Sequence, residues 1–439
     1  MKKVLFVEPK TEFNAYRLLS IPLVGPLILA TILKKQGHQV KVIAEAQRPL
    51  CDDEGGSLSP EVLEADVLAI SIMTATANRG YLLAQAARRA RPDIRIIIGG
   101  PHASLIPDEA AKYANLVVTG PGEEVICRAV EGDEEGILAG PQVEDLDGLP
   151  FVDIEVMDEP GRIHYFPIST SRGCPFKCNF CSVSAIFGSK YYFRSPENVM
   201  DEIELRLSQG FSKIFFCDDN FSANKSRAKG ILEEILKRGL HFRWVAECRP
   251  DVALDEELLD LMAKTRCRYV FIGFESFNPK TLRILNKRQE VEDIERCIRR
   301  LKERGIMVHG LFMLGADEDD LDSIAHTVRR SRDMGIDSAQ FAILFPIPGT
   351  PLYEDLDSQG RIFSKDWSKY DGTHVVFEPR LMTALQLQEK ALWAWRKFYS
   401  ISKVRDFFVL KILMKEWYKI NKGFMKWLRE RERGVVSAS

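Results

Sequence analysis

The sequence predicts an α/β protein with a doubly wound parallel sheet first, a partial (β/α)6 barrel next and a helical C-terminal region last. Short β-branched runs alternate with amphipathic helical stretches, and these runs are nearly continuous in apolar residues, as buried parallel strands require. A chain of 439 residues is also too long for one ordinary hydrophobic core. We therefore expect domains at 1–135 and 165–356, a connector at 136–164 and a helical region at 357–439.

The first domain contains five βα units, which favour a flavodoxin-like fold. Ligands of that architecture bind at the carboxyl ends of the strands. Those ends carry Thr74, then Gly99, Gly100 and His102, and then the segment Gly120-Pro121-Gly122-Glu123. The predicted strands are Lys3–Glu8, Gln39–Ile43, Ala65–Ser71, Ile94–Ile98 and Leu116–Val118.

A second βα series begins at Tyr165 and fits a partial barrel more naturally than a second open sheet. Spacing alone does not separate these two alternatives. In barrels of this kind the chemistry takes place where strands end in loops. The predicted strands are Tyr165–Ser171, Lys213–Cys217, Arg243–Cys248, Tyr269–Phe274, Met307–Leu314 and Ala339–Phe345.

The composition is that of a soluble globular protein, with 45% apolar and 28% charged residues, and the net charge of −2 gives no reason to expect nucleic acid as a partner. The longest apolar stretch, Ile21–Leu33, is shorter than a membrane span. The apolar run after Met1-Lys2-Lys3 ends at Glu8, which indicates a first strand and not a signal peptide. We therefore expect a cytoplasmic protein, whose nine cysteines indicate metal or redox chemistry.

Three cysteines, Cys174, Cys178 and Cys181, lie on one tight loop after a predicted strand. A 4Fe–4S cluster takes one ligand per iron, so three thiolates leave one iron open to a small chelating ligand. The amino and carboxylate groups of S-adenosylmethionine suit that position. The alternatives are a zinc site that lacks its fourth ligand and cysteines that pack in a core.

The spacing resembles the Cys-x-x-x-Cys-x-aromatic-Cys signature of the radical S-adenosylmethionine superfamily, and the resemblance extends from about Ile168 to Leu356. It implies a 4Fe–4S cluster on the three cysteines that reductively cleaves S-adenosylmethionine, with a flavodoxin- or ferredoxin-type electron donor. Phe180 matches the aromatic residue whose backbone touches the adenine in that family.

The ends of the next barrel strands carry further candidates for binding S-adenosylmethionine. Asp218 or Asp219 matches the place where the family binds the methionine amino group. Glu247 and Arg249 suit ribose or carboxylate contact, and Glu275 resembles the glutamate of the family's Gly-x-Glu-Ser segment. The alternatives are a solvated turn for the aspartates and salt-bridged strand ends for the others.

A doubly wound domain before a radical barrel resembles the cobalamin-binding class of the superfamily. The resemblance implies cobalamin beside Thr74, Gly99, Gly100, His102, Gly120, Gly122 and Glu123. The sequence contains no Asp-x-His-x-x-Gly motif for an axial histidine. In the alternative, the domain has lost its cofactor and uses the space for a long apolar substrate.

The family resemblance implies hydrogen abstraction from an unactivated carbon, followed by cobalamin-dependent C-methylation of an apolar lipid, isoprenoid, tetrapyrrole-like or natural-product substrate. The alternatives are an oxidative cyclase or carbon–carbon coupling enzyme, with or without cobalamin, and a non-catalytic Fe–S redox or binding protein. Cys217 and Tyr191 are candidate catalytic residues because both lie near the predicted site. For Cys217 the alternative is a buried apolar cysteine, and for Tyr191 it is packing within the loop.

The C-terminal region is basic, with twelve Lys or Arg and four Asp or Glu between Arg396 and Arg433. Two interpretations remain open. In the first, this region is an interfacial helix that makes peripheral membrane contact and collects a lipid substrate. In the second, it packs its apolar face on the barrel and leaves its charges in solvent.

Overall fold

The computed structural model describes residues 1–11, 21–188, 190–400 and 408–435, apart from the side chains of 408–417 and 420. Its N-terminal part is a parallel sheet in the order β2-β1-β3-β4-β5-β6. The order 2-1-3-4-5 confirms the predicted doubly wound, flavodoxin-like fold. The strands are β1 (Lys3–Glu8), β2 (Gln39–Ala44), β3 (Val67–Ser71), β4 (Arg95–Gly99), β5 (Leu116–Thr119) and β6 (Gly136–Ala139).

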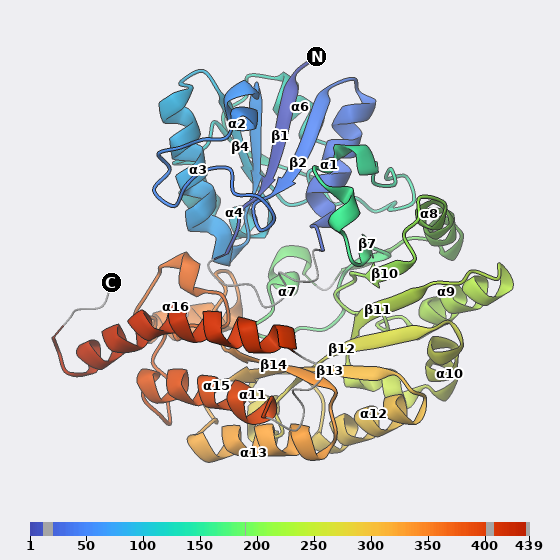
Figure 1. The fold of residues 1–439 in the computed structure, drawn as a ribbon, viewed down its shortest axis with the longest axis vertical. Helices are drawn as coiled ribbons and strands as arrows, with labels where there is room; N and C mark the ends of the chain where they lie inside the picture. Colours follow the sequence, from blue (N-terminus) through green and yellow to red (C-terminus); the bar gives the residue numbers. More distant parts are fainter. Residues whose placement is uncertain (12–20, 189, 401–407, 436–439) are drawn as a thin grey trace.

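Helices cover both faces of this sheet, with α3 on one side and α1 on the other (Figure 1). The strands between the helices are apolar on both faces, as the buried Val67 and Ile70 of β3 illustrate. The helices therefore pack their apolar sides against the sheet. The helices are α1 (Val24–Lys35), α2 (Pro60–Glu64), α3 (Ala77–Ala90), α4 (Pro101–Leu105), α5 (Pro107–Ala110) and α6 (Ile126–Glu131).

The expected connector at 136–164 differs from the structure at its start, where β6 pairs in parallel with β5. This edge strand has the sequence Gly-Ile-Leu-Ala, and three of its four residues are exposed. A short exposed edge strand shows neither the alternation nor the continuous apolar run that predicts a strand. β6 therefore forms because β5 offers it a strand to pair with, and its own sequence does not predict it.

The second sheet has the order β14-β13-β12-β11-β10-β7, and all its strands are parallel. Six strands paired in chain order confirm the predicted partial (β/α)6 barrel. The strands are β7 (Phe166–Ile168), β10 (Lys213–Phe216), β11 (Arg243–Cys248), β12 (Cys267–Glu275), β13 (Met307–Leu314) and β14 (Ser338–Ile343). The helices outside them are α8 (Pro196–Ser208), α9 (Lys225–Lys237), α10 (Glu256–Lys264), α11 (Pro279–Ile284), α12 (Val291–Glu303) and α13 (Leu321–Asp333).

The predicted strand at 165–171 is divided in the structure. β7 ends at Ile168, and β8 (Ser171–Gly173) then pairs with β9 (Tyr191–Phe193) in an antiparallel hairpin. Asp218 accepts hydrogen bonds from the backbone N–H groups of Thr170, at 2.6 Å, and Ser171, at 2.9 Å. These bonds satisfy the backbone N–H groups of residues that follow the end of β7 and no longer pair with the barrel sheet.

The C-terminal helices α14 (Pro351–Ser358), α15 (Ala384–Phe398) and α16 (Phe408–Glu432) follow the barrel. The Trp395 indole on α15 donates a hydrogen bond to the carbonyl of Phe341 on β14, at 2.9 Å. The second half of α16 packs on α15, where Gln388 donates to Asn421 at 3.0 Å and Leu428 is fully buried. The second half of α16 therefore packs on the protein, whereas residues 401–407 and 436–439 lie outside the described residues.

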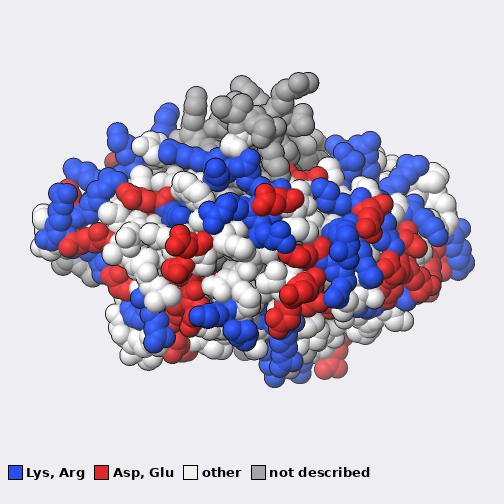
Figure 2. Space-filling model, turned by 90° about the horizontal axis from the view of Figure 1, so that it is seen from below, with Lys and Arg blue, Asp and Glu red and all other residues white. Residues whose placement is uncertain are grey.

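The C-terminal ends of the two sheets face each other, with α7 (Ser182–Phe187) between them (Figure 1). On the face that Figure 2 shows, basic and acidic side chains are interspersed. Within the described ranges, no helix is long and apolar enough to cross a membrane.

Candidate active site between the two sheets

A large cavity lies between the carboxyl ends of the two sheets. Its volume of about 480 Å³ lies within the roughly 300–1,000 Å³ of common small-molecule pockets. The N-terminal sheet contributes Gly99, Gly100, Gly120, Gly122 and Glu123 to its wall. The barrel side contributes Ser169, Ser171, Arg172, Ile186, Phe187, Phe215, Cys217 and Asp219.

The cysteine loop starts at Gly173, whose backbone no other residue could adopt easily. Its φ of +81° lies in the left-handed region, and a Cβ there would stand 2.4 Å from the carbonyl oxygen of Lys190. Cys174 follows directly, and Cys181 is the N-cap residue of α7. The hairpin of β8 and β9 thereby fixes the start of the loop that carries all three cysteines.

Hydrogen bonds from neighbouring segments hold the middle of this loop. The Asn179 amide donates to the carbonyl of Ile284 at 2.8 Å, and the Asn286 amide donates to the carbonyl of Lys177 at 2.8 Å. The Arg249 guanidinium stacks 3.9 Å above the Phe176 ring and lies 3.8 Å from the Cys178 sulfur. The loop is thus built into the barrel.

The three thiols are the predicted ligands of an iron–sulfur cluster. Among the described residues, no three His, Cys, Asp or Glu side chains converge on one metal-ion position. A 4Fe–4S cube distributes its protein ligands over separate irons, so its thiolates need not converge on one point. Burial raises the pKa of Cys174, and it raises the pKa of Cys181 to about 11, so their thiolate forms require a cationic partner.

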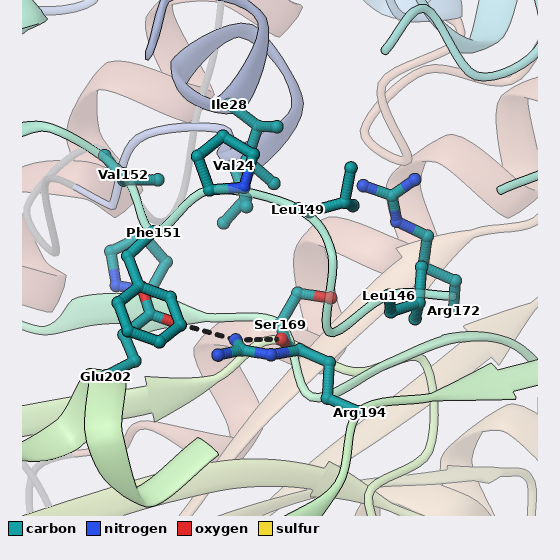
Figure 3. A pocket seen from close by; sticks show the side chains of 12 residues that line it. Val24, Ile28, Leu146, Leu149, Phe151, Val152, Ser169, Arg172, Arg194 and Glu202 are labelled. Atoms are coloured by element: carbon teal, nitrogen blue, oxygen red, sulfur yellow. Dashed lines mark hydrogen bonds and ion pairs between the residues drawn. The ribbon is translucent and has the colours of Figure 1, made fainter. Parts of the chain in front are cut away.

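A smaller cavity beside the site shows how β7 and the following residues are held (Figure 3). The Arg194 guanidinium donates to the carbonyl of Ser169 at 3.0 Å and pairs with Glu202 at 2.5 Å. The Ser169 backbone that Arg194 contacts precedes the cysteine loop by a few residues. This buried network therefore positions the approach to the loop.

The two aspartates at the end of β10 differ in their environments. Asp218 is buried and is occupied by the backbone N–H groups and the hydroxyl of the Thr170–Ser171 segment. Asp219 lines the cavity, where burial and then the charge of Asp218 raise its pKa to about 6, although a hydrogen bond from the backbone N–H of Gly173 opposes the rise. Asp219 is therefore the aspartate available to a ligand, and Asp218 has a positioning role.

Two more predicted carboxylates lie on the neighbouring strands. Burial, and then the charge of Asp219, raises the pKa of Glu247 to about 7. Glu275 forms a buried ion pair with Lys287 at 2.7 Å, and the Lys287 ammonium lies 5.9 Å from the Phe180 ring. The φ of Glu275 is +61°, an uncommon conformation that often accompanies a functional site.

The two candidate catalytic residues have different surroundings. Cys217 lines the cavity, and burial raises the pKa of its thiol well above the ordinary value, so the thiol stays protonated. Tyr191 lies on β9, where its hydroxyl is buried and burial raises its pKa. Tyr191 does not line the cavity.

The glycines predicted to contact cobalamin all line the N-terminal wall of the cavity. Gly100 has a φ of +96°, and a Cβ there would stand 2.8 Å from the carbonyl oxygen of Ile72. Gly99, Gly120 and Gly122 present backbone in place of side chains on the same wall. Such a wall lets a large flat ligand approach the backbone closely, so its shape fits a corrin ring.

The structure does not bring His102 and Thr74 to this wall. His102 is completely buried, with Nδ1 3.3 Å from the Thr74 hydroxyl and its ring centroid 5.2 Å from that of Trp367. Burial lowers the pKa of His102. The expectation that His102 and Thr74 contact cobalamin is therefore not supported, because both side chains pack beneath the wall.

Sequence reasoning missed one charged pair that connects the two walls. Arg172, two residues before Cys174, forms an ion pair with Glu123 at 2.5 Å, and both side chains are largely buried. The second carboxylate oxygen of Glu123 is buried and has no hydrogen-bond partner among the residues that the structure describes. A pair between segments 49 residues apart has no local sequence signal, because it depends on how the two sheets are placed.

Comparisons with known proteins agree with this geometry. A model of the radical SAM superfamily matches residues 168–330, and a model of the B12 binding domain matches residues 16–130. The chain is 28% identical to a bacteriochlorophyllide d C-12(1)-methyltransferase of Chlorobaculum tepidum, over 92% of this chain and 88% of the relative. It is 25% identical to an anaerobic magnesium-protoporphyrin IX monomethyl ester cyclase of Rubrivivax gelatinosus, over 90% of this chain and 77% of the relative.

A solved structure shares the fold. The radical S-adenosylmethionine methyltransferase TsrM of Kitasatospora setae, with cobalamin and a [4Fe–4S] cluster bound, aligns with a TM-score of 0.65 and 22% identity. The alignment covers 82% of this chain and 78% of that structure.

Proposed function

The chain belongs to the cobalamin-binding class of the radical S-adenosylmethionine superfamily, and we propose that it transfers a methyl group to an unactivated carbon of an apolar small molecule. The observation that carries the proposal is the shared cavity. Its glycine-rich wall and its barrel wall, with Cys217 and Asp219, enclose one space. A substrate in that space would lie between two cofactors.

Each cofactor has a defined contribution when it is bound. The 4Fe–4S cluster supplies the electron that cleaves S-adenosylmethionine and so removes hydrogen from the substrate, and cobalamin supplies the methyl group. The protein contributes binding, orientation and exclusion of water. Buried apolar walls around Phe187 and Phe215 favour that exclusion.

We assign the binding of cluster and S-adenosylmethionine residue by residue. Cys174, Cys178 and Cys181 hold the cluster, and Asp219 accepts a hydrogen bond from the methionine amino group. Glu247 and the Glu275–Lys287 pair lie beyond Asp219 on the next strands, in positions for the ribose and carboxylate. Arg249 holds the loop through Phe176 and Cys178, and Phe180 offers its backbone to the adenine.

The cobalamin side uses shape more than charge. Gly99, Gly100, Gly120 and Gly122 leave room for the ring. The Glu123 oxygen that has no partner within the described part of the chain is suited to accept a hydrogen bond from an amide side chain of the corrin. His102 is not an axial ligand in this proposal, since its ring is sealed between Thr74 and Trp367.

The substrate class is inferred from aromatic side chains of the barrel interior, of which Phe215 also lines the cavity. Phe215 of β10 and Phe271 of β12 place their rings 6.1 Å apart, and His309 lies against Phe271 at 5.0 Å. Burial lowers the pKa of His309 to about 3, so its ring stays neutral. An apolar interior with a neutral imidazole suits a tetrapyrrole, hopanoid or other isoprenoid-like molecule.

We place the enzyme in the cytoplasm and propose that a flavodoxin- or ferredoxin-type donor reduces it. We also propose that its basic C-terminal region makes peripheral contact with the membrane.

The decisive experiment uses S-adenosylmethionine labelled in its methyl group. We expect two molecules of S-adenosylmethionine to be consumed per product, one giving 5′-deoxyadenosine and one giving the label in the product. If deoxyadenosine forms but no label reaches the product, methyl transfer is wrong. In that case the cyclase alternative, which the Rubrivivax relative favours, takes its place.

A further inference from the structure

The outer side of the cysteine loop carries four exposed basic residues, Lys177, Lys280, Arg283 and Arg288, which we call the basic rim. We propose that the basic rim is the docking surface for a small acidic electron-carrier protein that reduces the cluster. Of the proposed function, this inference requires only that the protein holds the cluster.

Hydrogen bonds bring the basic rim to the cysteine loop. The Asn286 amide bonds to the carbonyl of Lys177, and the Asn179 amide bonds to the carbonyl of Ile284, each at 2.8 Å. Lys280 and Arg283 lie three residues apart on α11, so they share one face of that helix. The C-terminal end of α11 and the residues after it therefore lie against the outer part of the cysteine loop.

The charges of the basic rim are not neutralised within the protein. Among the described residues, none of the four side chains takes part in an ion pair, although the chain as a whole has almost equal numbers of acidic and basic residues. Arg288 also adopts a left-handed backbone conformation with a φ of 51°. A non-glycine residue in that region is uncommon, and such conformations concentrate at functional sites.

An apolar groove of about 270 Å³ lies next to the basic rim. Ile284, Leu352 and Leu356 line it together with Asn179 of the cysteine loop, and Ile284 is 38% exposed. Of the two acidic residues in the groove, Asp317 is neutralised by Arg361 at 2.6 Å, which leaves Asp355. An apolar centre with a charged rim is the usual anatomy of a protein–protein interface.

The chemistry at this surface identifies the partner. Electron transfer requires close approach to the cluster, and the loop is reached from outside at Lys177 and Ile284. Arg249 links the segment before Arg288 to a cluster ligand, because it contacts both the carbonyl of Lys287 and the Cys178 sulfur. One electron passes from the reduced carrier to the oxidised cluster, so the carrier is oxidised by one electron and the cluster is reduced by one. A positive surface attracts an acidic carrier and speeds its association.

The test compares two triple charge reversals of the holoenzyme. The first, Lys280→Glu with Arg283→Glu and Arg288→Glu, reverses the basic rim. The control, Lys213→Glu with Arg243→Glu and Arg268→Glu, reverses three exposed residues at the opposite ends of barrel strands. Cluster reduction is followed by absorbance without S-adenosylmethionine or cobalamin, with reduced flavodoxin or dithionite as reductant, and flavodoxin affinity is measured by biolayer interferometry.

We expect the basic-rim variant to be reduced by flavodoxin at least tenfold more slowly than wild type, with correspondingly weaker binding, while dithionite reduces both equally. The control variant should behave like wild type, and salt should slow only the flavodoxin reaction. Equal flavodoxin rates in the basic-rim variant and wild type would overturn the proposal. The proposal would also be overturned if the basic-rim variant lost binding to phosphatidylserine vesicles but kept its affinity for flavodoxin, because the surface would then contact lipid. A wild-type protein without iron would instead refute the proposed function.

Discussion

The two walls of the central cavity are both made from the carboxyl ends of parallel strands, yet their side chains differ in kind. The N-terminal wall presents backbone at Gly99, Gly100, Gly120 and Gly122, with Glu123 as its charged group. The barrel wall presents a thiol at Cys217 and a carboxylate at Asp219, and the cysteine loop lies beside it.

The difference shows how one architecture serves two ligands. Glycines remove side chains and so select by shape, which suits a large, rigid ring. Thiols and carboxylates select by charge and coordination, which suits a cluster and a small cationic substrate. The Arg172–Glu123 ion pair connects the two walls. The comparison predicts that damage to one wall leaves the other wall's ligand bound.

The largest expected effect is at the cysteine loop. Cys178→Ala should abolish the brown chromophore and the formation of 5′-deoxyadenosine, because two thiolates do not hold a 4Fe–4S cluster. Iron and sulfide analysis of the reconstituted protein measures the first effect. Cobalamin binding, followed by its visible spectrum, should persist. Cys127→Ala on α6 is the matched control and should keep both cofactors; a brown, active Cys178→Ala protein would contradict the assignment.

Breaking the pair between the walls should have the next largest effect. Arg172→Ala leaves the buried carboxylate of Glu123 without its partner, which costs about 3–5 kcal/mol for pairs of this kind. Thermal unfolding should show the loss. The combined change Arg172→Met with Glu123→Gln should recover most of it, because no buried charge remains. If Arg172→Ala were as stable as wild type, the Arg172–Glu123 ion pair would not link the two walls.

The shape of the N-terminal wall is tested at one glycine. Gly100→Ala forces a Cβ against the backbone of Ile72 and strains a φ of +96°, at a cost of about 1–3 kcal/mol. We expect weaker cobalamin binding, with iron content and S-adenosylmethionine cleavage retained. Gly161→Ala is the control, since no atom of the described ranges lies within 4 Å of its added Cβ. Loss of the cluster in Gly100→Ala would mean that the walls do not act separately.

Much of this architecture was predictable because local signals agree with the tertiary fold. Strands such as Lys3–Glu8 and Met307–Leu314 are bounded as predicted, since each is a long apolar or β-branched run ended by polar or glycine residues. Edge elements such as β6 and β9 were missed because they are short and partly exposed. The cysteine loop has a local signature, so its position was found from sequence.

The interactions that depend on packing could not be read in advance. Asp218 and Asp219 are adjacent and chemically identical, and only the path of Thr170 and Ser171 shows which one is occupied. His102 follows two glycines that line the cavity, yet its side chain points to Trp367, 265 residues away in the sequence. The ligand role of each residue stays a prediction that the experiments above decide.

The smallest expected effect concerns Glu8 at the end of β1. Burial raises its pKa to about 8, although the backbone N–H of Leu23, a residue of the cavity wall, donates to it at 3.1 Å. The folded state then keeps a proton that the unfolded state releases above about pH 4.5. Stability should therefore fall as the pH rises from about 4.5 to about 8.

Glu8→Gln removes this dependence because the amide does not titrate. Each pKa unit corresponds to roughly 1.4 kcal/mol, and for a side chain that is only half-buried we expect a gain on the order of 1–2 kcal/mol at pH 8. Melting temperatures of wild type and variant at pH 5 and pH 8 measure the effect, with the exposed Glu64→Gln as control. The same decline in both proteins would show that Glu8 is ionised in the folded state. A charge would then lie directly behind Leu23 of the N-terminal wall, and the contrast between the two walls would be smaller than the structure indicates.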